Sequence, residues 1–315
     1  MRIRVQVPAS SANLGCGFDV FGLALARYSA FVFDTDLDSG PPLRTAGIDA
    51  AALQTEGCRL VYKAVEAYEV ACGLRVPPFR LEVQSGIPVG RGLGSSAAAI
   101  IGGLLGADAL VRGAAQSLSC ETEQRRRLLE LACRLEGHAD NIAAALCGGL
   151  VVAIAQAARE SYPVVIPLPT PGDLVAVVFL PGLPLSTAAA RAILPAQVPL
   201  GDAVHNTARA ALFVSIFAAP QGRLHLLSEA MNDRLHQPYR VELLPHLPDF
   251  IRSAEEAGAY GAALSGAGPS ILALCPRERA EAVRVALESA SVSHEVPGSA
   301  EMLEIATEGA VVEYL

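Results

Sequence analysis

A glycine-rich stretch at residues 86–100 constrains the fold of this chain more than any other part of the sequence. Three glycines alternate with other residues at positions 90, 92 and 94, and two serines follow at positions 95 and 96. Residues 79–85 alternate between apolar and polar side chains, which predicts a strand. Residues 97–111 contain no proline and are rich in alanine and leucine, which predicts a helix. The stretch therefore predicts a strand, a glycine loop and a helix in succession.

This arrangement suits the binding of phosphate. Glycine allows positive φ angles and lets a ligand approach the backbone N–H groups closely. The N-terminus of the following helix adds unpaired N–H groups and a dipole that favours anions. The hydroxyls of Ser95 and Ser96 are placed to cap the helix or to reach a phosphate-bound Mg²⁺. An ordinary glycine turn with a serine cap has the same spacing, so both interpretations remain open at this point.

Two other phosphate motifs fit less well. A Walker loop requires a Gly-Lys-Ser/Thr sequence, and Lys63 is the only lysine in the chain, which excludes it. A dinucleotide fingerprint over Gly92, Gly94 and Ala97 would need a second strand and an acidic residue about 20 residues further on. The apolar helical pattern instead continues through Asp108 and Val111.

Length and composition limit the class of protein. A chain of 315 residues predicts two domains, and 52% hydrophobic against 18% charged residues argues against disorder. The net charge of −8 comes without a basic stripe, so no nucleic-acid partner is expected. Seven scattered cysteines without a C-x-x-C pair indicate neither a disulfide framework nor a zinc site. The N-terminus lacks the apolar core of a signal peptide and no apolar run reaches membrane-spanning length, so we expect a cytoplasmic protein without a membrane partner.

Helical and strand patterns mix along the whole chain, which predicts an α+β fold. Prolines cluster at positions 163, 167, 169 and 171, and we place the domain boundary there, between residues 1–165 and 166–315. Strands are expected at residues 2–7, 25–34, 79–85, 150–154, 174–180, 260–264 and 270–275. Helices are expected at residues 57–72, 97–111, 120–135, 186–193, 202–217, 224–231, 246–257 and 277–290. Residues 34–49 are expected to form a polar connection.

Three further groups of residues are candidates for a site. Glu136, His138, Asp140 and Asn141 lie within six residues, where oxygen atoms suit a hard cation, although a helix-capping region has the same composition. The loop at residues 265–270 is either a tight hairpin turn or a flexible glycine loop that closes near the phosphates of a ligand.

The third group is an amide and a carboxylate, Asn13 and Asp19, in a glycine-containing loop. Such a pair can hold an amino group or hydroxyl, or form an Asx-turn, and the turn is favoured by the spacing alone. Nothing local marks Arg191 or Arg240 among the 23 arginines, and no G-x-S-x-G elbow indicates a serine hydrolase.

Taken together, these motifs resemble those of the GHMP small-molecule kinases, and within them the homoserine kinase family. The similarity extends over nearly the whole chain and rests on segments in the same order, namely residues 7–19, 88–98, 136–141, 185–191, 233–240 and 265–270. Ala139 and Ala144 depart from the residues common at these positions, which affects only the expected shape of the local loop.

The resemblance implies a fold with an N-terminal domain like ribosomal protein S5 domain 2 and a ferredoxin-like C-terminal domain. It also implies transfer of phosphate from ATP to the hydroxyl of L-homoserine in threonine biosynthesis, with Mg²⁺ and as a homodimer. Without a P-loop lysine, backbone amides at residues 92–96 and the helix start must hold the ATP phosphates. Phosphoryl transfer depends mostly on positioning and charge stabilisation.

The residues that the resemblance implies fall into four groups. ATP would contact Pro88, Val89, Gly90, Arg91, Gly92, Leu93, Gly94, Ser95, Ser96, Ala97, Ala98, Gly266 and Gly268, and the metal would be held by Ser96 and Glu136. Homoserine would lie among Asn13, Asp19, His138, Arg191 and Arg240. Asp19 suits the ammonium group and the two arginines suit the carboxylate. The transferring phosphoryl group would lie near Asn141 and Thr187, and the candidate catalytic residues are Asn141, Asp140, Thr187 and Arg191.

Many members of the superfamily have an aspartate as candidate base where Asn141 falls here. An amide does not accept a proton at neutral pH, so we expect no strong protein base, with Asp140 as a possible exception. Two other functions remain open: a GHMP kinase for mevalonate or another isoprenoid precursor, and a non-catalytic protein of the same fold. The intact glycine loop argues against the second of these.

Overall fold

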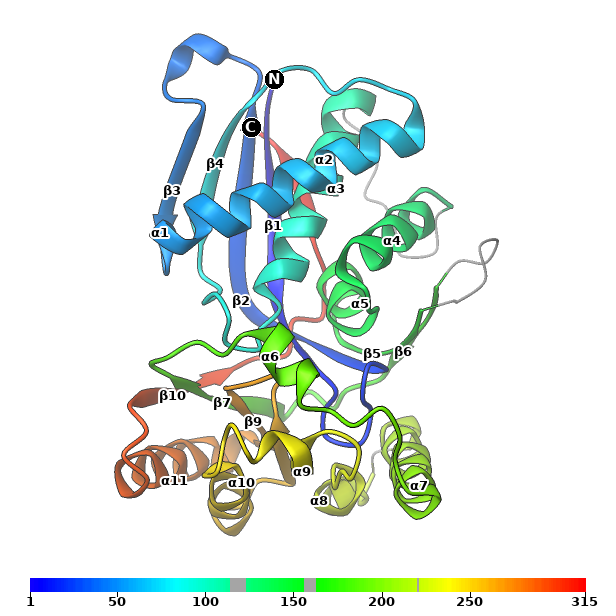
Figure 1. Cartoon of the computed structure of the whole chain (residues 1–315), viewed down its shortest axis with the longest axis vertical. Coiled ribbons are helices and arrows are strands. Elements are labelled where there is room, and N and C mark those ends of the chain that lie inside the picture. Colours follow the sequence, from blue (N-terminus) through cyan, green and yellow to red (C-terminus); the bar gives the residue numbers. More distant parts are fainter. Residues whose placement is uncertain (114–122, 156–162, 220) are drawn as a thin grey trace.

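The chain folds around two β-sheets stacked along its long axis (Figure 1). The computed structural model describes residues 1–113, 123–155, 163–219 and 221–315. The first sheet has seven strands, with the path β11-β1-β2-β4-β3 and with β5 paired to β2 and β6 to β5. The second sheet has four strands in the order β10-β7-β9-β8. This mixture of sheets and helices confirms the expected α+β class.

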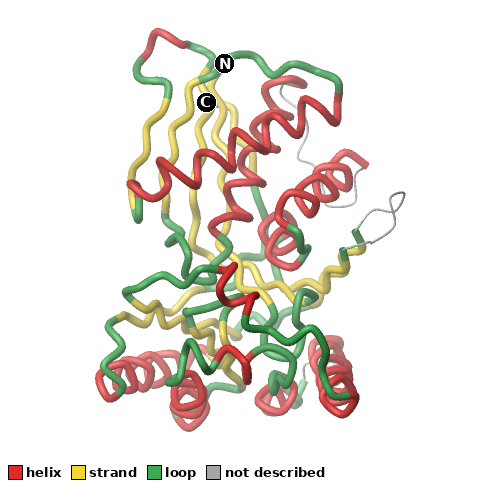
Figure 2. Tube along the Cα trace, viewed as in Figure 1, coloured by secondary structure: helices red, strands yellow, loops and turns green. Residues whose placement is uncertain are grey.

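The strands have the following bounds: β1 Arg2–Ala12, β2 Phe21–Asp34, β3 Leu43–Gly47, β4 Arg80–Ser85, β5 Leu150–Ile154, β6 Val164–Leu168, β7 Leu174–Pro181, β8 Gly261–Leu264, β9 Ile271–Pro276, β10 Gly298–Leu303 and β11 Val311–Tyr314. The helices are α1 Ala50–Ala52, α2 Cys58–Cys72, α3 Ser95–Arg112, α4 Glu123–Glu136, α5 Asp140–Cys147, α6 Thr187–Ala192, α7 Leu200–Ala218, α8 Leu227–Ala230, α9 Gln237–Arg240, α10 Leu247–Glu256 and α11 Ala280–Ser293. Figure 2 shows how the strands of both sheets approach each other at the middle of the molecule.

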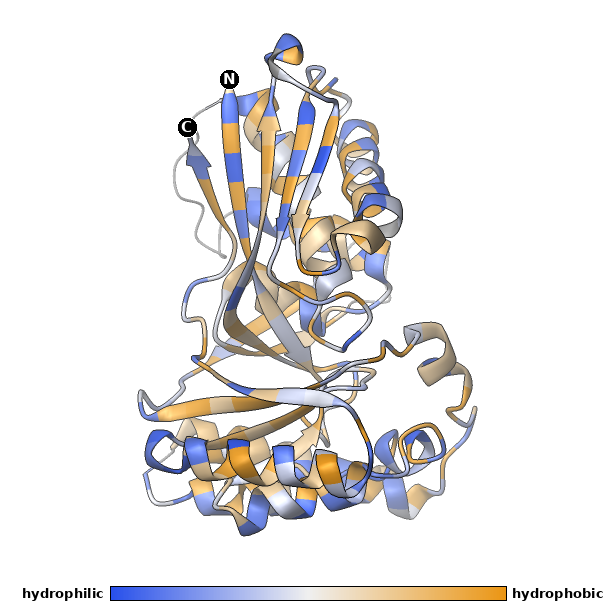
Figure 3. Ribbon diagram, turned by 90° about the vertical axis from the view of Figure 1, so that its left-hand side faces the viewer, coloured by the Kyte–Doolittle hydropathy of each residue, from blue (hydrophilic) through white to orange (hydrophobic). Residues whose placement is uncertain are grey.

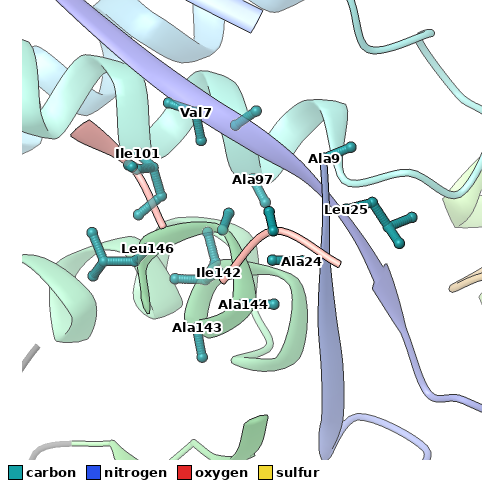
Figure 4. Close-up of a cluster of buried hydrophobic side chains, with 14 of the residues drawn as sticks. Val7, Ala9, Ala24, Leu25, Ala97, Ile101, Ile142, Ala143, Ala144 and Leu146 are labelled. Atoms are coloured by element: carbon teal, nitrogen blue, oxygen red, sulfur yellow. The ribbon is translucent and has the colours of Figure 1, made fainter. Parts of the chain in front are cut away.

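Helices α2 to α5 lie together beside one face of the first sheet, and α10 and α11 cover the outer face of the second (Figure 1). Hydrophobic and hydrophilic residues alternate along the strands, as expected for a sheet with one covered face (Figure 3). The first core lies between α3, α5 and the sheet, where Val7, Ile101, Ile142 and Leu146 meet (Figure 4).

Helix α3 is the central helix of this layer. Its residues from Ala97 to Leu110 are buried, including the carboxylate of Asp108. A Cβ atom on Gly103 would lie 2.6 Å from the carbonyl oxygen of Val61, so only glycine allows α2 and α3 to pack this closely. By length and composition α3 is apolar enough to cross a membrane, but 78% of that segment is buried inside the protein, as in the core helix of a globular domain.

Several sequence predictions of secondary structure need correction. Strand β1 does not end at Pro8 but continues to Ala12. The pairing with β2 shifts its register between Pro8 and Ala9, and a proline, which has no N–H to donate, is tolerated at such an irregularity. The connection at residues 34–49 contains strand β3, which pairs in parallel with β4. Helix α9 was not predicted, and the expected start of α4 at residues 120–122 lies outside the described residues.

The expected division into residues 1–165 and 166–315 stays a prediction. The proline-containing segment at the proposed boundary forms strand β6, which pairs with β5 in the first sheet. Strand β11, near the C-terminus, pairs with β1 in the same sheet. The first sheet therefore includes two segments that lie wholly or mostly beyond residue 165.

Candidate active site

A cleft of about 960 Å³ lies where the two sheets meet. Its wall includes most of the residues predicted for the site, namely Asn13, Asp19, Val89, Gly90, Arg91, Gly92, Gly94, Ser95, Ser96, Glu136, His138, Asp140, Asn141, Thr187, Arg191, Arg240 and Gly266. Segments that are far apart in the sequence thus meet in one cavity.

Five residues predicted to bind ATP are not among the lining residues. Leu93, Ala97 and Ala98 are buried in the core, and Pro88 and Gly268 are also buried, next in sequence to the lining residues Val89 and Ala267. Their apolar or absent side chains support the loop from behind, so the lining residues at this end are mainly the glycines and serines.

The glycine loop at residues 90–94 has the backbone shape that its sequence predicts. Gly90, Gly92 and Gly94 all have positive φ angles, between 65° and 71°, and Gly94 is the N-cap of α3. The hydroxyl of Ser265 donates a 2.6 Å hydrogen bond to the carbonyl of Gly92. A Cβ atom on Gly92 would lie 2.2 Å from the carbonyl oxygen of Ser265. The loop is therefore held against the 265–270 loop, with the N-terminus of an 18-residue helix behind it.

At the start of α3, the hydroxyl of Ser96 donates a hydrogen bond to the carboxylate of Glu136, at the end of α4. These two oxygen-bearing side chains come from different helices and line the same cleft. Oxygen donors of this kind suit a hard divalent cation, so the residues present fit Mg²⁺.

The guanidinium of Arg91 is not a free phosphate ligand. It donates to Asp49 over 2.7 Å and to the carbonyls of Pro181 and Gly182 over 2.9 and 2.8 Å. The same carboxylate of Asp49 accepts a hydrogen bond from the backbone of Val89 over 2.9 Å. Arg91 therefore connects the glycine loop to the end of β7 in the second sheet.

At the other end of the cleft, Asn13 and Asp19 both line the cavity, and they close a seven-residue loop rather than the short Asx-turn that the spacing favoured. Both have positive φ angles, and the Asn13 side chain accepts a 3.0 Å hydrogen bond from the backbone of Asp19. Its amide group donates to the carbonyl of Gly266 over 2.9 Å, which links the loop to the second sheet. The side chain of Asp19 is left to face Arg191, with which it forms a bidentate ion pair.

Arg240 lies beside this ion pair and is 1% exposed. It donates to the carbonyls of Ala190 and Gly266 and to Nδ1 of His236, all within 3.1 Å. Because a guanidinium only donates, Nδ1 of His236 accepts and its Nε2–H donates to the carbonyl of Gly15 over 2.8 Å. Burial, followed by the charge of Arg191, lowers the pKa of Arg240 to about 10.

His138 and Asp140 form a tight pair, with Nδ1 and Oδ1 2.6 Å apart. The same oxygen accepts a 2.7 Å hydrogen bond from the backbone of Asn141, and Asp140 is 1% exposed. Burial lowers the pKa of His138, but the hydrogen bond to Asp140 and the charges of Asp140 and Glu136 outweigh it, so the pKa is raised overall. The hydroxyl of Ser10 donates to Oδ1 of Asn141 over 2.9 Å, which leaves the amide NH₂ of Asn141 as a donor.

Ligand atoms of Asp19, His138 and Asp140 lie within 4.8 Å of one another. Such a group has the composition of a metal site. In the described structure, however, Asp19 is paired with Arg191 and Asp140 with His138.

Sequence reasoning missed four residues at or behind the cleft: Ser10, Phe18, Asp49 and His236. Ser10 and Phe18 belong to the 7–19 motif and His236 to the 233–240 motif, so their neighbours in the sequence were a usable signal. Asp49 lies in a polar segment, residues 34–49, whose sequence gave no signal of a site.

Comparison with known proteins identifies the class first. The family described as "GHMP kinases N terminal domain" matches residues 59–149, and "GHMP kinases C terminal" matches residues 213–293. The chain belongs to the GHMP kinases.

Full-length relatives narrow this to the homoserine kinase family. Homoserine kinase from Synechococcus sp. is 40% identical over 99% of this chain and 98% of the relative, and that from Desulfitobacterium hafniense is 37% identical over 98% and 99%. The crystal structure of homoserine kinase from Cytophaga hutchinsonii superposes with a TM-score of 0.81 at 28% identity, covering 99% and 97% of the two chains. A mevalonate kinase from L. major, at 15% identity and a TM-score of 0.65, shares the fold. These likenesses confirm the expected GHMP kinase fold and family.

Proposed function

We propose that this chain transfers the γ-phosphoryl group of ATP to the hydroxyl of L-homoserine, giving O-phospho-L-homoserine for threonine biosynthesis. One observation supports this most strongly. The glycine loop with its Ser96–Glu136 pair opens into the same cleft as the charged residues Asp19, Arg191 and Arg240. Family membership supports the same activity through relatives of similar length.

The backbone amides of residues 92–96 and the N-terminus of α3 would hold the ATP phosphates. Ser96 and Glu136 would hold Mg²⁺, which when bound neutralises charge on the phosphates. Asp19 would bind the ammonium group of homoserine, and Arg191 and Arg240 its carboxylate. Thr187, at the start of α6, would lie near the transferring group.

Orientation rather than proton abstraction would then activate the acceptor hydroxyl. The amide NH₂ of Asn141 is a donor, and both hydrogen bonds to Asp140 Oδ1 hold that carboxylate in place. The amide of Asn141 is not suited to remove a proton, so the proton would leave late or to the phosphate, with Asp140 as the one carboxylate that could take it instead.

The test is an ADP-release assay of the purified chain with Mg²⁺ and ATP, offering homoserine, mevalonate or galactose separately. We expect turnover with homoserine alone, and phosphorus NMR should identify the phosphate ester. Glu136→Gln should lower kcat at least about 100-fold with the fold intact, because an amide is a poorer ligand for Mg²⁺ than a carboxylate. Turnover with mevalonate alone would favour the isoprenoid reading, and no turnover at all would favour a binding protein.

Two predictions remain: a cytoplasmic location, from the sequence pattern, and a homodimer, from the family resemblance. Sedimentation equilibrium of the purified chain would test the second, with a mass near twice 32.7 kDa as the expected result.

A further inference from the structure

An ion pair within the protein joins the two groups proposed to bind the charges of the amino acid. Arg191, in the last turn of α6, donates to both carboxylate oxygens of Asp19, over 3.1 and 2.7 Å. The two side chains are 38% and 34% exposed and both line the cleft. They are 172 residues apart in the sequence, so the tertiary fold creates this contact.

A second cation makes the pocket attractive to an additional anion. Arg240 donates hydrogen bonds to three uncharged partners, two carbonyls and a neutral histidine, and the carboxylates of Asp19 and Asp233 favour its charge without a hydrogen bond to it. Both arginines lie over the ring of Phe18, with the guanidinium carbons of Arg191 and Arg240 5.7 and 5.6 Å from its centre. The two guanidinium groups thus share contact with one ring, and Asp19 is the carboxylate paired to Arg191.

We propose that the Asp19–Arg191 ion pair is an internal competitor for the substrate, and that it selects an acceptor carrying both charges. This inference rests on the proposed function. When the pair opens, an amino acid gives Asp19 an ammonium group and Arg191 a carboxylate, so both partners are replaced. An acceptor with only one of these charges opens the same pair and leaves the other partner without a counter-ion. A group left unpaired in this way is what makes a polar site reject an analogue.

Two analogues of homoserine each retain one charge and the hydroxyl. 4-Hydroxybutyrate has the carboxylate but no ammonium group, and 3-amino-1-propanol has the ammonium group but no carboxylate. If Asp19 competes for Arg191, then Asp19→Asn should bind 4-hydroxybutyrate more tightly than the wild type does. The expected gain is about fivefold, the factor that a partly exposed ion pair contributes. The same variant should bind homoserine at least about tenfold more weakly.

Isothermal titration of the full chain with each compound measures these affinities. Arg191→Gln provides the reciprocal variant, since it frees Asp19 and should tighten the binding of 3-amino-1-propanol by a similar factor. Asp202→Asn is a matched control, because it removes one negative charge from a surface pair with Arg234 outside the cleft. We expect it to change no affinity beyond error.

Unchanged or weaker binding of 4-hydroxybutyrate by folded Asp19→Asn would overturn the proposal, because Asp19 would then serve only as the ammonium ligand. The Arg191→Gln arm decides the question if Asp19→Asn does not fold, since unchanged binding of 3-amino-1-propanol contradicts the competition equally. Failure of the proposed function is separate: it appears as absent turnover of homoserine by the wild type. The affinities of the two analogues measure the competition by the ion pair whether or not the wild type turns over homoserine.

Discussion

At the scale of single residues, the charged groups at the acceptor end of the cleft are positioned by other protein groups. Asp140 is fixed by His138 and by the backbone of Asn141. Arg240 is fixed by His236, whose own orientation depends on the carbonyl of Gly15. Groups held in this way keep a geometry ready for the substrate, which is how phosphoryl transfer gains most of its rate.

The position of Asp140 gives a prediction about its role. Asp140→Asn should lower kcat about 10- to 100-fold at saturating substrates, because the amide orients His138 less well than the carboxylate does. Steady-state kinetics with calorimetric homoserine binding measures this. A loss above about 10⁴-fold with homoserine binding intact would instead identify Asp140 as the general base.

The residues of the site differ in how far the sequence could predict them. Asn13, Asp19 and the 136–141 group lie in short dense motifs, so their neighbours along the chain drew attention to them. Arg191 and Arg240 have no such local signal and entered only through the family resemblance. The Asp19–Arg191 contact joins segments 172 residues apart, and no local pattern encodes such a distance.

At the scale of structural elements, Arg91 connects three parts of the fold. Its guanidinium reaches Asp49 just before α1 and the two carbonyls at the end of β7. Each acceptor is reached by a different nitrogen, Nη1, Nε or Nη2, spread across the planar guanidinium, whereas the single nitrogen of an ammonium group cannot take all three positions. Arg91 therefore fixes the glycine loop relative to both sheets.

Replacing Arg91 by lysine should loosen the loop without removing charge. We expect KM for ATP to rise about tenfold while KM for homoserine stays within about twofold, because only the nucleotide end depends on this link. Asp49→Asn should show the same pattern. In the double variant, the rise in KM for ATP, expressed as a free energy, should be smaller than the sum of the two single effects. Additive effects, or an equal rise of both KM values, would contradict a shared link.

Strands β3 and β6 show where element prediction from the sequence failed. Both lie in segments rich in proline, glycine or charge, which the sequence pattern assigns to loops. Each pairs with one neighbouring strand in the described sheet, and an edge strand tolerates a proline such as Pro167. The long apolar helices were predicted within about three residues at each end, because burial on one face imposes a regular pattern, whereas β1 and β2 extend five and four residues beyond their predicted bounds.

At the scale of the whole molecule, the first sheet is completed by the end of the chain. β11 pairs with β1 from Ile3 opposite Tyr314 to Gln6 opposite Val311. The hydroxyl of Tyr314 also donates to the carbonyl of Gly113, beyond the C-terminus of α3. A boundary drawn in the middle of the sequence could not foresee this return, because the pairing depends on strands from opposite ends.

Removing residues 311–315 should destabilise the protein without altering the cleft. β1 would become an unpaired edge, and we expect the melting temperature to fall by about 5 °C or more. Differential scanning fluorimetry measures this, with deletion of Leu315 alone as the control, since it removes one backbone hydrogen bond. An unchanged melting temperature would show that β11 adds no stability.

The pairing of residues 3 and 314 has a consequence for how the protein acquires its shape. Nearly the entire polypeptide must be made and brought round before the outermost hydrogen bonds of the sheet can form, and the entropy of closing so large a loop is lost at that step. Joining the two ends by a short peptide would make the same contact local. Permuted versions opened at a surface turn should then gain this edge of the sheet early in folding.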